Sequence, residues 1–288
     1  MRGTRMERTR PNGAKTLRTA IAFLVHSNLF ISTASTGVAL STTLLAGFAP
    51  EPLPLGIVFV ATLFVYSLNR LTDIEEDSRN VPERAAFTER YGRPLLAVGA
   101  ALYLAAILAA IEAGVRGAPF LLSPVAVAFL YSLVGVKRIL LMKNLLVGLS
   151  WGAIPLGVGV YYGAVSAPEI VVSFGFFTVM LTVAAAVFDI KDIRGDRAEG
   201  IRTAPVVFGP RATRIGALAV TVAVGGGLLG VVGVGIVPRR FLLLFGFLAY
   251  VAAYVPFATT DRGPLFYGFV IDGEHVFLTA LVVAFELL

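Results

Sequence analysis

The feature that most constrains this chain is a series of apolar runs, each long enough to cross a lipid bilayer. A helix of roughly 20 residues spans the hydrocarbon core. The runs are continuously apolar, whereas a membrane β-strand alternates apolar and polar residues. With 57% hydrophobic and 15% charged residues, the chain holds more apolar surface than one soluble core can bury. The prediction is an all-α, polytopic membrane bundle of about nine transmembrane helices.

The expected spans follow a basic tail, residues 1–19, which is expected to be cytoplasmic and disordered. Residues 20–288 then form one transmembrane domain. Asp272, Glu274 and His275 interrupt the last span. The expected spans are Ala20–Ala46, Leu55–Leu71, Leu95–Gly114, Phe120–Val136, Leu145–Gly163, Ile170–Phe188, Ile215–Val237, Phe241–Phe257 and Phe266–Leu288.

The distribution of basic residues predicts the orientation, because Lys and Arg near helix ends are retained on the cytoplasmic side. All of the 24 Lys and Arg residues fall in connections at one side, except Arg116, Arg239 and Arg240. The amino terminus is therefore expected in the cytoplasm of a prokaryotic cell, and the carboxyl terminus outside. This distribution assigns the positive charge to membrane topology and lipid contact rather than to nucleic-acid binding.

Two clusters of polar residues lie where spans reach the cytoplasmic side. Asn69, Asp73 and Asp77 are spaced i, i+4, i+8 at the end of the second span, which places them on one helical face if the helix continues. A second trio at the end of the sixth span, spaced i, i+3, i+7, aligns in the same way. Its members are Asp189, Asp192 and Asp196. Because the clusters lie four spans apart, the chain is expected to contain two related four-helix halves.

Carboxylates in this pattern suit a hard metal ion. Mg²⁺ prefers oxygen ligands and commonly uses one or two carboxylates together with phosphate oxygens and water. The chain has no Cys and only two His residues, which excludes thiolate and His-rich metal sites. Two facing carboxylate groups could hold Mg²⁺, or Mn²⁺ in its place, against a pyrophosphate that leaves an allylic carbon. Nearby cations could share this charge, and the candidates are Lys137, Arg138, Lys191 and Arg194.

Two alternatives concern these charged residues. Acidic residues beside Arg can also form a solvated collar at the level of the lipid headgroups, although two clusters at equivalent positions favour a site. Lys137 and Arg138 could serve only to fix topology. In that case the phosphate-binding cations are sought among Arg84, Lys191, Arg194 and Arg197.

The two clusters also carry a family resemblance. Asn69-x3-Asp73-x3-Asp77 resembles the first signature of the UbiA superfamily of intramembrane prenyltransferases. The second trio, followed by Arg197 and Gly200-Ile-Arg-Thr203, is similar to the second signature. The segment between them resembles the family through Tyr131, Lys137-Arg138, Lys143-Asn144 and Trp151-Gly152.

The resemblance implies a helical bundle with a cavity capped on the cytoplasmic side, where Mg²⁺ and an isoprenyl pyrophosphate bind. Family members ionise this donor, and a lipophilic or aromatic acceptor captures the carbocation. Asp73 and Asp192 are the implied catalytic ligands, and Tyr131 would face the reacting carbon. The implied metal ligands are Asn69, Asp73, Asp77, Asp189, Asp192 and Asp196. The implied pyrophosphate-binding residues are Asn69, Lys137, Arg138, Asn144, Lys191 and Arg194.

Two other functions share parts of the pattern. A membrane phosphotransferase that uses cytidine nucleotides also has paired aspartates, but it requires Gly directly after the second Asp, where this chain has Ile193 after Asp192. A cation-coupled transporter would place its carboxylates near the membrane midplane, whereas these clusters lie at the ends of spans. The acceptor and the length of the prenyl chain stay open from sequence.

Overall fold

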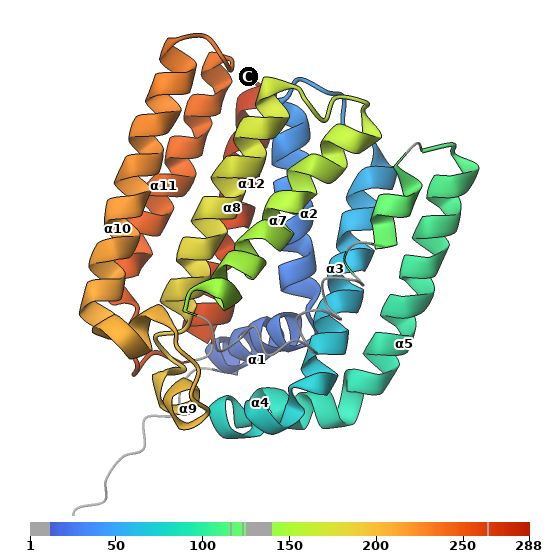
Figure 1. The fold of residues 1–288 in the computed structure, drawn as a ribbon. Coiled ribbons are helices and arrows are strands. Elements are labelled where there is room, and N and C mark those ends of the chain that lie inside the picture. Colours follow the sequence, from blue (N-terminus) through green and yellow to red (C-terminus); the bar gives the residue numbers. More distant parts are fainter. Residues whose placement is uncertain (1–11, 116, 123, 125–139, 264) are drawn as a thin grey trace, which may run out of the picture.

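Every regular element that the structure describes is a helix. The computed structural model (Figure 1) describes residues 12–115, 117–122, 124, 140–263 and 265–288. Seven helices in these ranges are long and apolar enough to cross a membrane, or eight if the bent pair α1–α2 counts as one span. The prediction of an all-α polytopic membrane bundle is confirmed.

The described elements follow one another along the chain. Their bounds are α1 Asn12–His26, α2 Leu29–Leu45, α3 Pro52–Thr72, α4 Ile74–Asn80, α5 Pro82–Glu112, η1 Ala118–Leu122, α7 Met142–Tyr161, α8 Pro168–Phe188, α9 Ile193–Ala198, α10 Ala204–Gly233, η3 Arg239–Leu243, α11 Leu244–Tyr254, η4 Val255–Phe257, η5 Phe266–Ile271 and α12 Gly273–Glu286.

The first expected span is not one helix. The chain bends by 67° between α1 and α2, and Asn28 at the bend has a φ of 62°, a left-handed conformation that Asn tolerates better than most residues. Helix α1 lies across one end of the bundle, whereas α2 runs through it (Figure 1). The prediction of a single helix over Ala20–Ala46 is therefore wrong. Because α1 begins at Asn12, residues 12–19 are helical rather than disordered.

The fourth expected span, Phe120–Val136, lies mostly outside the described residues. The short helix η1 ends at Leu122, and residues 125–139 are not described. The count of nine spans and the division into two four-helix halves therefore stay predictions. The remaining spans lie within a few residues of their expected positions, apart from the amino-terminal extensions of α5 and α10.

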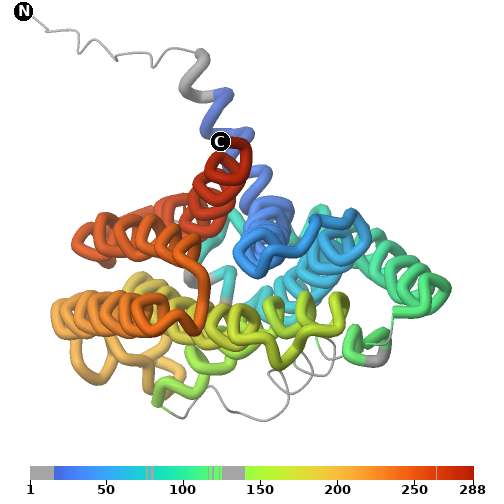
Figure 2. The backbone as a smooth tube through the Cα atoms, turned by 90° about the horizontal axis from the view of Figure 1, so that it is seen from above, coloured from blue at the N-terminus to red at the C-terminus, as the bar shows by residue number. Residues whose placement is uncertain are grey.

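Helix α2 is central to the bundle, since it contacts α3, α7, α8 and α12. Viewed along the bundle, α10 and α11 lie at one side and α5 at the opposite side (Figure 2). The buried core joins the central helices through large side chains, including Phe177, Met180, Phe247 and Leu278. On α5, by contrast, Leu102, Leu104, Leu108 and Ile111 are exposed, as is expected where lipid is the solvent.

Close approach of α7 and α8 depends on glycine. A Cβ atom at Gly148 would clash with the carbonyl oxygen of Thr178 and the hydroxyl of Thr182, and one at Gly152 would clash with the Thr178 hydroxyl. Small residues allow membrane helices to approach closely and gain packing contacts. This close pair holds Asn144, near the start of α7, against the end of α8.

We expect Gly148→Ala to destabilise the protein. The added methyl group meets backbone atoms that cannot move without separating α7 from α8, and such overpacking costs about 1 to 3 kcal/mol. The measurement is the thermal unfolding midpoint in detergent. Gly157→Ala on the same helix is the matched control, because a Cβ there meets no atom within 4 Å. Equal midpoints for the two variants would contradict the assigned role of Gly148.

Candidate functional site

The first aspartate cluster crosses a break between a long and a short helix. Helix α3 ends at Thr72, Asp73 occupies the break, and α4 begins at Ile74. The backbone N–H of Asp73 donates to the carbonyl of Asn69 at 2.9 Å, and that of Asp77 donates to Asp73 at 2.9 Å. The helical hydrogen-bond pattern therefore continues through the break and preserves the i, i+4, i+8 spacing.

The second cluster crosses an equivalent break between α8 and α9. Asp189 follows the last residue of α8, and Asp192 immediately precedes α9. The N–H of Asp192 donates to the Asp189 carbonyl at 3.1 Å, and that of Asp196 to the Asp192 carbonyl at 2.9 Å. Helices α4 and α9 contact each other at the same end of the bundle (Figure 1). The fold therefore brings both clusters to one end.

Arginine holds the first cluster. The carboxylate of Asp77 is 3% exposed and accepts a hydrogen bond of 2.8 Å from Nε of Arg84 and a second from Nη2 of Arg84. Nη1 of Arg70 lies 4.0 Å from the same carboxylate. Two-point contacts of this kind fix both geometry and charge. Arg84 belongs to α5, so the ion pair joins the start of α5 to α4.

Lysine and amide groups hold the second cluster. Asp189 accepts hydrogen bonds from Nζ of Lys143 at 2.9 Å and from Nδ2 of Asn144 at 2.8 Å. Asp196 accepts one from Oγ1 of Thr203 at 3.1 Å, and its carboxylate lies 3.9 Å from the same Lys143 ammonium. One cation at the start of α7 thus serves two buried carboxylates of the second cluster.

Burial shifts the pKa values of two charged side chains at this end of the bundle. It raises the pKa of Asp196 to about 6, and the neighbouring Lys143 opposes the shift. Burial also lowers the pKa of Lys191, and the adjacent Asp192 carboxylate opposes that change. Each charge is therefore costly here unless an opposite charge stands beside it.

A cavity of about 50 Å³ lies among α1, α2, α3, α5, α8 and the start of α12. We call it the basic cavity, because Arg70, Arg84 and Lys191 line it. All three cations connect it with the clusters: Arg84 binds Asp77, Nη1 of Arg70 lies 4.0 Å from the same carboxylate, and Nζ of Lys191 lies 2.6 Å from Asp192. The other lining residues are Val25, His26, Asn28, Phe30, Ile31, Tyr66, Val81, Phe188, Gly268 and Asp272.

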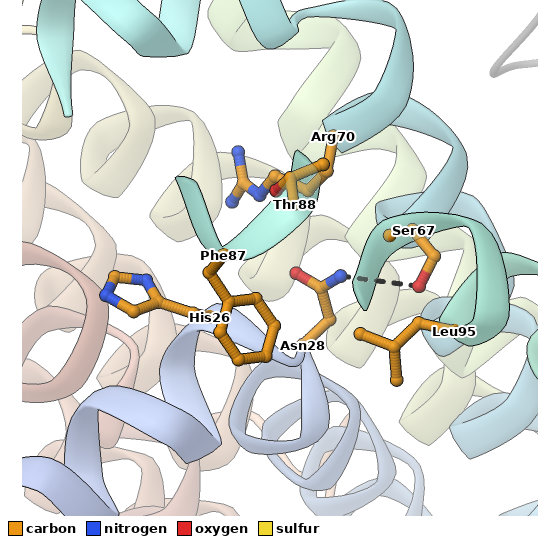
Figure 3. A pocket seen from close by; sticks show the side chains of 8 residues that line it. His26, Asn28, Ser67, Arg70, Phe87, Thr88 and Leu95 are labelled. Atoms are coloured by element: carbon orange, nitrogen blue, oxygen red, sulfur yellow. Dashed lines mark hydrogen bonds between the residues drawn. The ribbon is translucent and has the colours of Figure 1, made fainter. Parts of the chain in front are cut away.

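A second, smaller cavity adjoins the basic cavity and holds about 10 Å³, roughly the room that one water molecule needs. The two cavities share His26, Asn28 and Arg70. Figure 3 shows the hydrogen bond from Asn28 to Ser67, which is 3.4 Å long and crosses the smaller cavity. The bend at Asn28 thus helps to shape this end of the bundle.

The structure does not place all of the expected residues at the basic cavity. Lys191 lines it, whereas Arg194 is exposed on α9. Asn69 and Asp73 are half-buried and are not among its lining residues, and Asn144 contacts Asp189. The expected roles of Tyr131, Lys137 and Arg138 fall on residues outside the described ranges. Sequence reasoning missed Tyr66, Arg70 and Asp272; for Asp272, an acidic residue inside an apolar run was the available signal.

The chemistry of the donor set fits Mg²⁺. The two clusters offer carboxylate and amide oxygens, the ligand types that this ion prefers, and in this structure Asp77, Asp189 and Asp192 each contact a cation. Within the described ranges, no three acidic or His side chains converge on one point. A metal at either cluster would therefore need phosphate oxygens or water to complete its coordination.

Comparisons with known proteins give a consistent picture. The sequence model of the UbiA prenyltransferase family matches residues 30–266. A curated relative from Streptomyces somaliensis, named Somaliensene A/B synthase, is 31% identical over 176 residues, which cover 53% of this chain and 52% of the relative. The chain therefore spans about half the length of the curated relative it matches.

Two solved structures share the fold. The apo structure of a UbiA homolog from Aeropyrum pernix K1 matches with a TM-score of 0.67 and 17% identity, covering 91% of this chain and 99% of the other. A structure of digeranylgeranylglyceryl phosphate synthase matches with a TM-score of 0.59 and 18% identity, covering 95% of this chain and 98% of the other. The helical arrangement is thus similar to theirs across nearly the whole chain.

We expect Lys143→Met to destabilise the protein, because it removes the ammonium that serves Asp189 and Asp196. Leaving a buried carboxylate without its cation costs about 3 kcal/mol. The thermal unfolding midpoint in detergent measures the loss. Arg197→Met is the control, since Arg197 is exposed on α9 beside the same cluster. A Lys143→Met protein as stable as the control would show that the ion pair contributes little.

Proposed function

The chain belongs to the UbiA prenyltransferase family, and from this membership we propose a specific reaction for this membrane enzyme. An isoprenyl pyrophosphate binds at the end of the bundle that bears the aspartates, ionises with the help of Mg²⁺, and passes its prenyl group to a lipophilic or aromatic acceptor. Pyrophosphate is released. We further propose that this end faces the cytoplasm, as the basic residues predict.

The observation that carries the proposal is the basic cavity between the two aspartate clusters. Arg70, Arg84 and Lys191 line it, and they offer both point charges and planar guanidinium groups to phosphate oxygens. Apolar residues such as Phe30, Ile31 and Phe188 also line the cavity. A ligand with an anionic head and an apolar tail matches this mixed lining.

The aspartates then act by exchanging partners. Arg84 now holds Asp77, and Lys191 holds Asp192. When pyrophosphate enters, these two cations would turn to its oxygens, and the freed Asp77 and Asp192 carboxylates would be available to hold a metal ion. Bound Mg²⁺ would supply charge stabilisation for the leaving pyrophosphate. Asn69, Asp73 and Asp77 would hold one ion, and Asp189, Asp192 and Asp196 the other.

The aromatic side chains beside Lys191 support its assignment to phosphate binding. Its Nζ lies 5.5 Å from the ring centre of Phe188 and 5.9 Å from that of Tyr267, so the ammonium is held by aromatic faces as well as by Asp192. These rings limit where the ammonium can move. Because Lys191 also lines the basic cavity, an anion that enters this cavity would meet the ammonium there. Tyr131, Lys137, Arg138, Asn144 and Arg194 keep the roles that the family resemblance gives them, as proposals.

Two kinds of acceptor are candidates. The first is a separate lipophilic or aromatic molecule, as the family resemblance implies. The second is the donor's own double bond, which would capture the carbocation within one molecule. This candidate is favoured by the match to Somaliensene A/B synthase, a name that identifies products and no separate acceptor.

We expect Asp73→Ala and Asp192→Ala each to abolish pyrophosphate release from isoprenyl pyrophosphates while the protein remains folded. Each change removes a metal ligand at the leaving group, where metal-assisted stabilisation is worth several kcal/mol. Release should also need Mg²⁺ or Mn²⁺ and stop in excess chelator. Glu75→Ala, at an exposed position on α4, is the matched control. Near wild-type release in both Asp variants, or full release with chelator, would reject the metal assignment.

We expect Arg84→Gln and Lys191→Gln each to raise the KM for the donor by about 10-fold or more, because a charged hydrogen bond contributes roughly 1.5 to 3 kcal/mol. Arg90→Gln, at an exposed position further along α5, should leave the KM unchanged. Steady-state kinetics on folded variants measure these KM values. Unchanged KM values for Arg84→Gln and Lys191→Gln would move the phosphate-binding role to Lys137 and Arg138.

A further inference from the structure

A buried polar cluster lies between α11 and α12, and neither aspartate motif includes it. It consists of Tyr254, Glu274 and His275. Glu274 is 0% exposed and His275 1% exposed. The Tyr254 hydroxyl donates a hydrogen bond of 2.9 Å to Oε2 of Glu274, and Oε1 of Glu274 lies 3.5 Å from Nε2 of His275. The polar residues that interrupt the last span therefore contact one another and Tyr254 in one buried cluster.

Three polar atoms of this cluster have no hydrogen-bond partner among the described residues. They are Oε1 of Glu274 and both ring nitrogens of His275. Ionisable side chains inside a membrane protein are costly, and buried polar atoms almost always have partners. The Tyr254–Glu274 bond alone would tie α11 to α12, so His275 is unnecessary for that purpose. These nitrogens have no hydrogen-bond partner in the part of the chain that the structure describes, and they are therefore open to a reaction partner.

Aromatic rings form the walls around His275. Trp151 stacks on the imidazole with ring centres 4.6 Å apart and an angle of 22°. The ring centres of Phe247 and Phe177 lie 5.5 Å and 6.4 Å away. Aromatic faces attract cations and carry no hydrogen-bond donors for an anion. The site therefore suits an apolar or cationic partner rather than a phosphate or a carboxylate.

The cluster lies one helical turn inward from the basic cavity. Asp272 lines that cavity, and His275 follows three residues later, about 4.5 Å further along the helix axis. On α2, Ile31 lines the cavity, while a Cβ at Gly37 would lie 3.4 Å from the carbonyl oxygen of His275. A donor with its pyrophosphate in the cavity and its tail directed into the bundle would extend toward His275.

We propose that His275, oriented by Glu274 and Tyr254, accepts the proton that the prenyl carbocation loses when the product forms. This inference rests on the proposed prenyl transfer and adds its final step. The C–O bond of the donor breaks, and pyrophosphate leaves with the electron pair. Capture by an aromatic acceptor or by the donor's own double bond forms a C–C bond and leaves the positive charge on carbon.

The final step then removes that charge. A C–H bond beside the cationic carbon breaks, its electron pair forms a C=C bond or restores the aromatic ring, and the proton joins a lone pair of His275. The Glu274 carboxylate balances the resulting imidazolium. Before the next turnover the proton passes to water. Deprotonation by His275 competes with capture of the cation by water, which would form an alcohol.

The test uses His275→Phe in the full chain, since Phe retains the stacking on Trp151 without a basic nitrogen. Purified protein in lipid vesicles made from a membrane extract receives geranyl, farnesyl or geranylgeranyl pyrophosphate with Mg²⁺. Pyrophosphate release should stay close to wild type, because ionisation occurs at the aspartate end. Mass spectrometry should show the coupled or cyclised product falling roughly 100-fold, the contribution typical of a general base, while prenyl alcohol rises.

Tyr250→Phe is the matched control. It removes a hydrogen bond of 2.8 Å that joins α11 to the carbonyl of Val270 in η5, from a ring 6.0 Å from that of Tyr254, and it should leave the products unchanged. If His275→Phe does not fold, Glu274→Gln replaces it: Gln can still accept from Tyr254 but cannot balance an imidazolium, so alcohol should again rise.

Wild-type products from folded His275→Phe, or from Glu274→Gln in its place, would overturn the inference. A parallel change in Tyr250→Phe would also overturn it, because the effect would then come from packing. A wild-type protein that releases no pyrophosphate from any of the three donors would instead overturn the proposed function. The two failures are distinguishable because pyrophosphate release is measured separately from the product.

Discussion

The pairing of buried carboxylates with cations at one end of the bundle is the interaction on which the rest of the structure depends. Asp77, Asp189 and Asp196 are each less than 5% exposed, and an isolated carboxylate at such a position would be too costly to remain charged. Arg84 on α5 and Lys143 on α7 supply the opposite charge. These pairs fix how α5 meets α4 and how α7 meets α8.

Placing the aspartates at breaks between helices makes this arrangement useful for binding. Asp73 and Asp189 follow long helices, Asp77 and Asp196 lie on the short helices α4 and α9, and Asp192 immediately precedes α9. The basic cavity is lined by Arg84 and Lys191, which contact the two clusters, and by apolar side chains such as Phe30. In the proposed reaction the charged groups would hold the anionic head of the donor, and the apolar groups would meet its hydrocarbon tail.

The cost of burying polar groups also applies to the cluster of Tyr254, Glu274 and His275, but here the groups are only partly paired. The Tyr254 hydroxyl donates to Oε2 of Glu274, and Nε2 of His275 lies 3.5 Å from Oε1 of the same carboxylate. Neither ring nitrogen has a hydrogen-bond partner among the described residues, and such an imidazole is costly in an interior with few polar groups. In the reaction proposed above, the aspartate end would serve the leaving group and this cluster would serve the carbocation.

The sequence by itself determined the membrane class, the positions of most spans and the two aspartate clusters, because hydropathy and i, i+4 spacing are local properties of the chain. It did not determine the bend at Asn28, which depends on contacts such as the one with Ser67, 39 residues later. Nor did it determine which cations serve the carboxylates: Lys143 reaches Asp189 across 46 residues, and Arg70 and Asp272 meet at one cavity from opposite ends of the chain. Tertiary structure decided these points, because electrostatic partners and cavity walls are set by which helices pack together rather than by their order in the sequence.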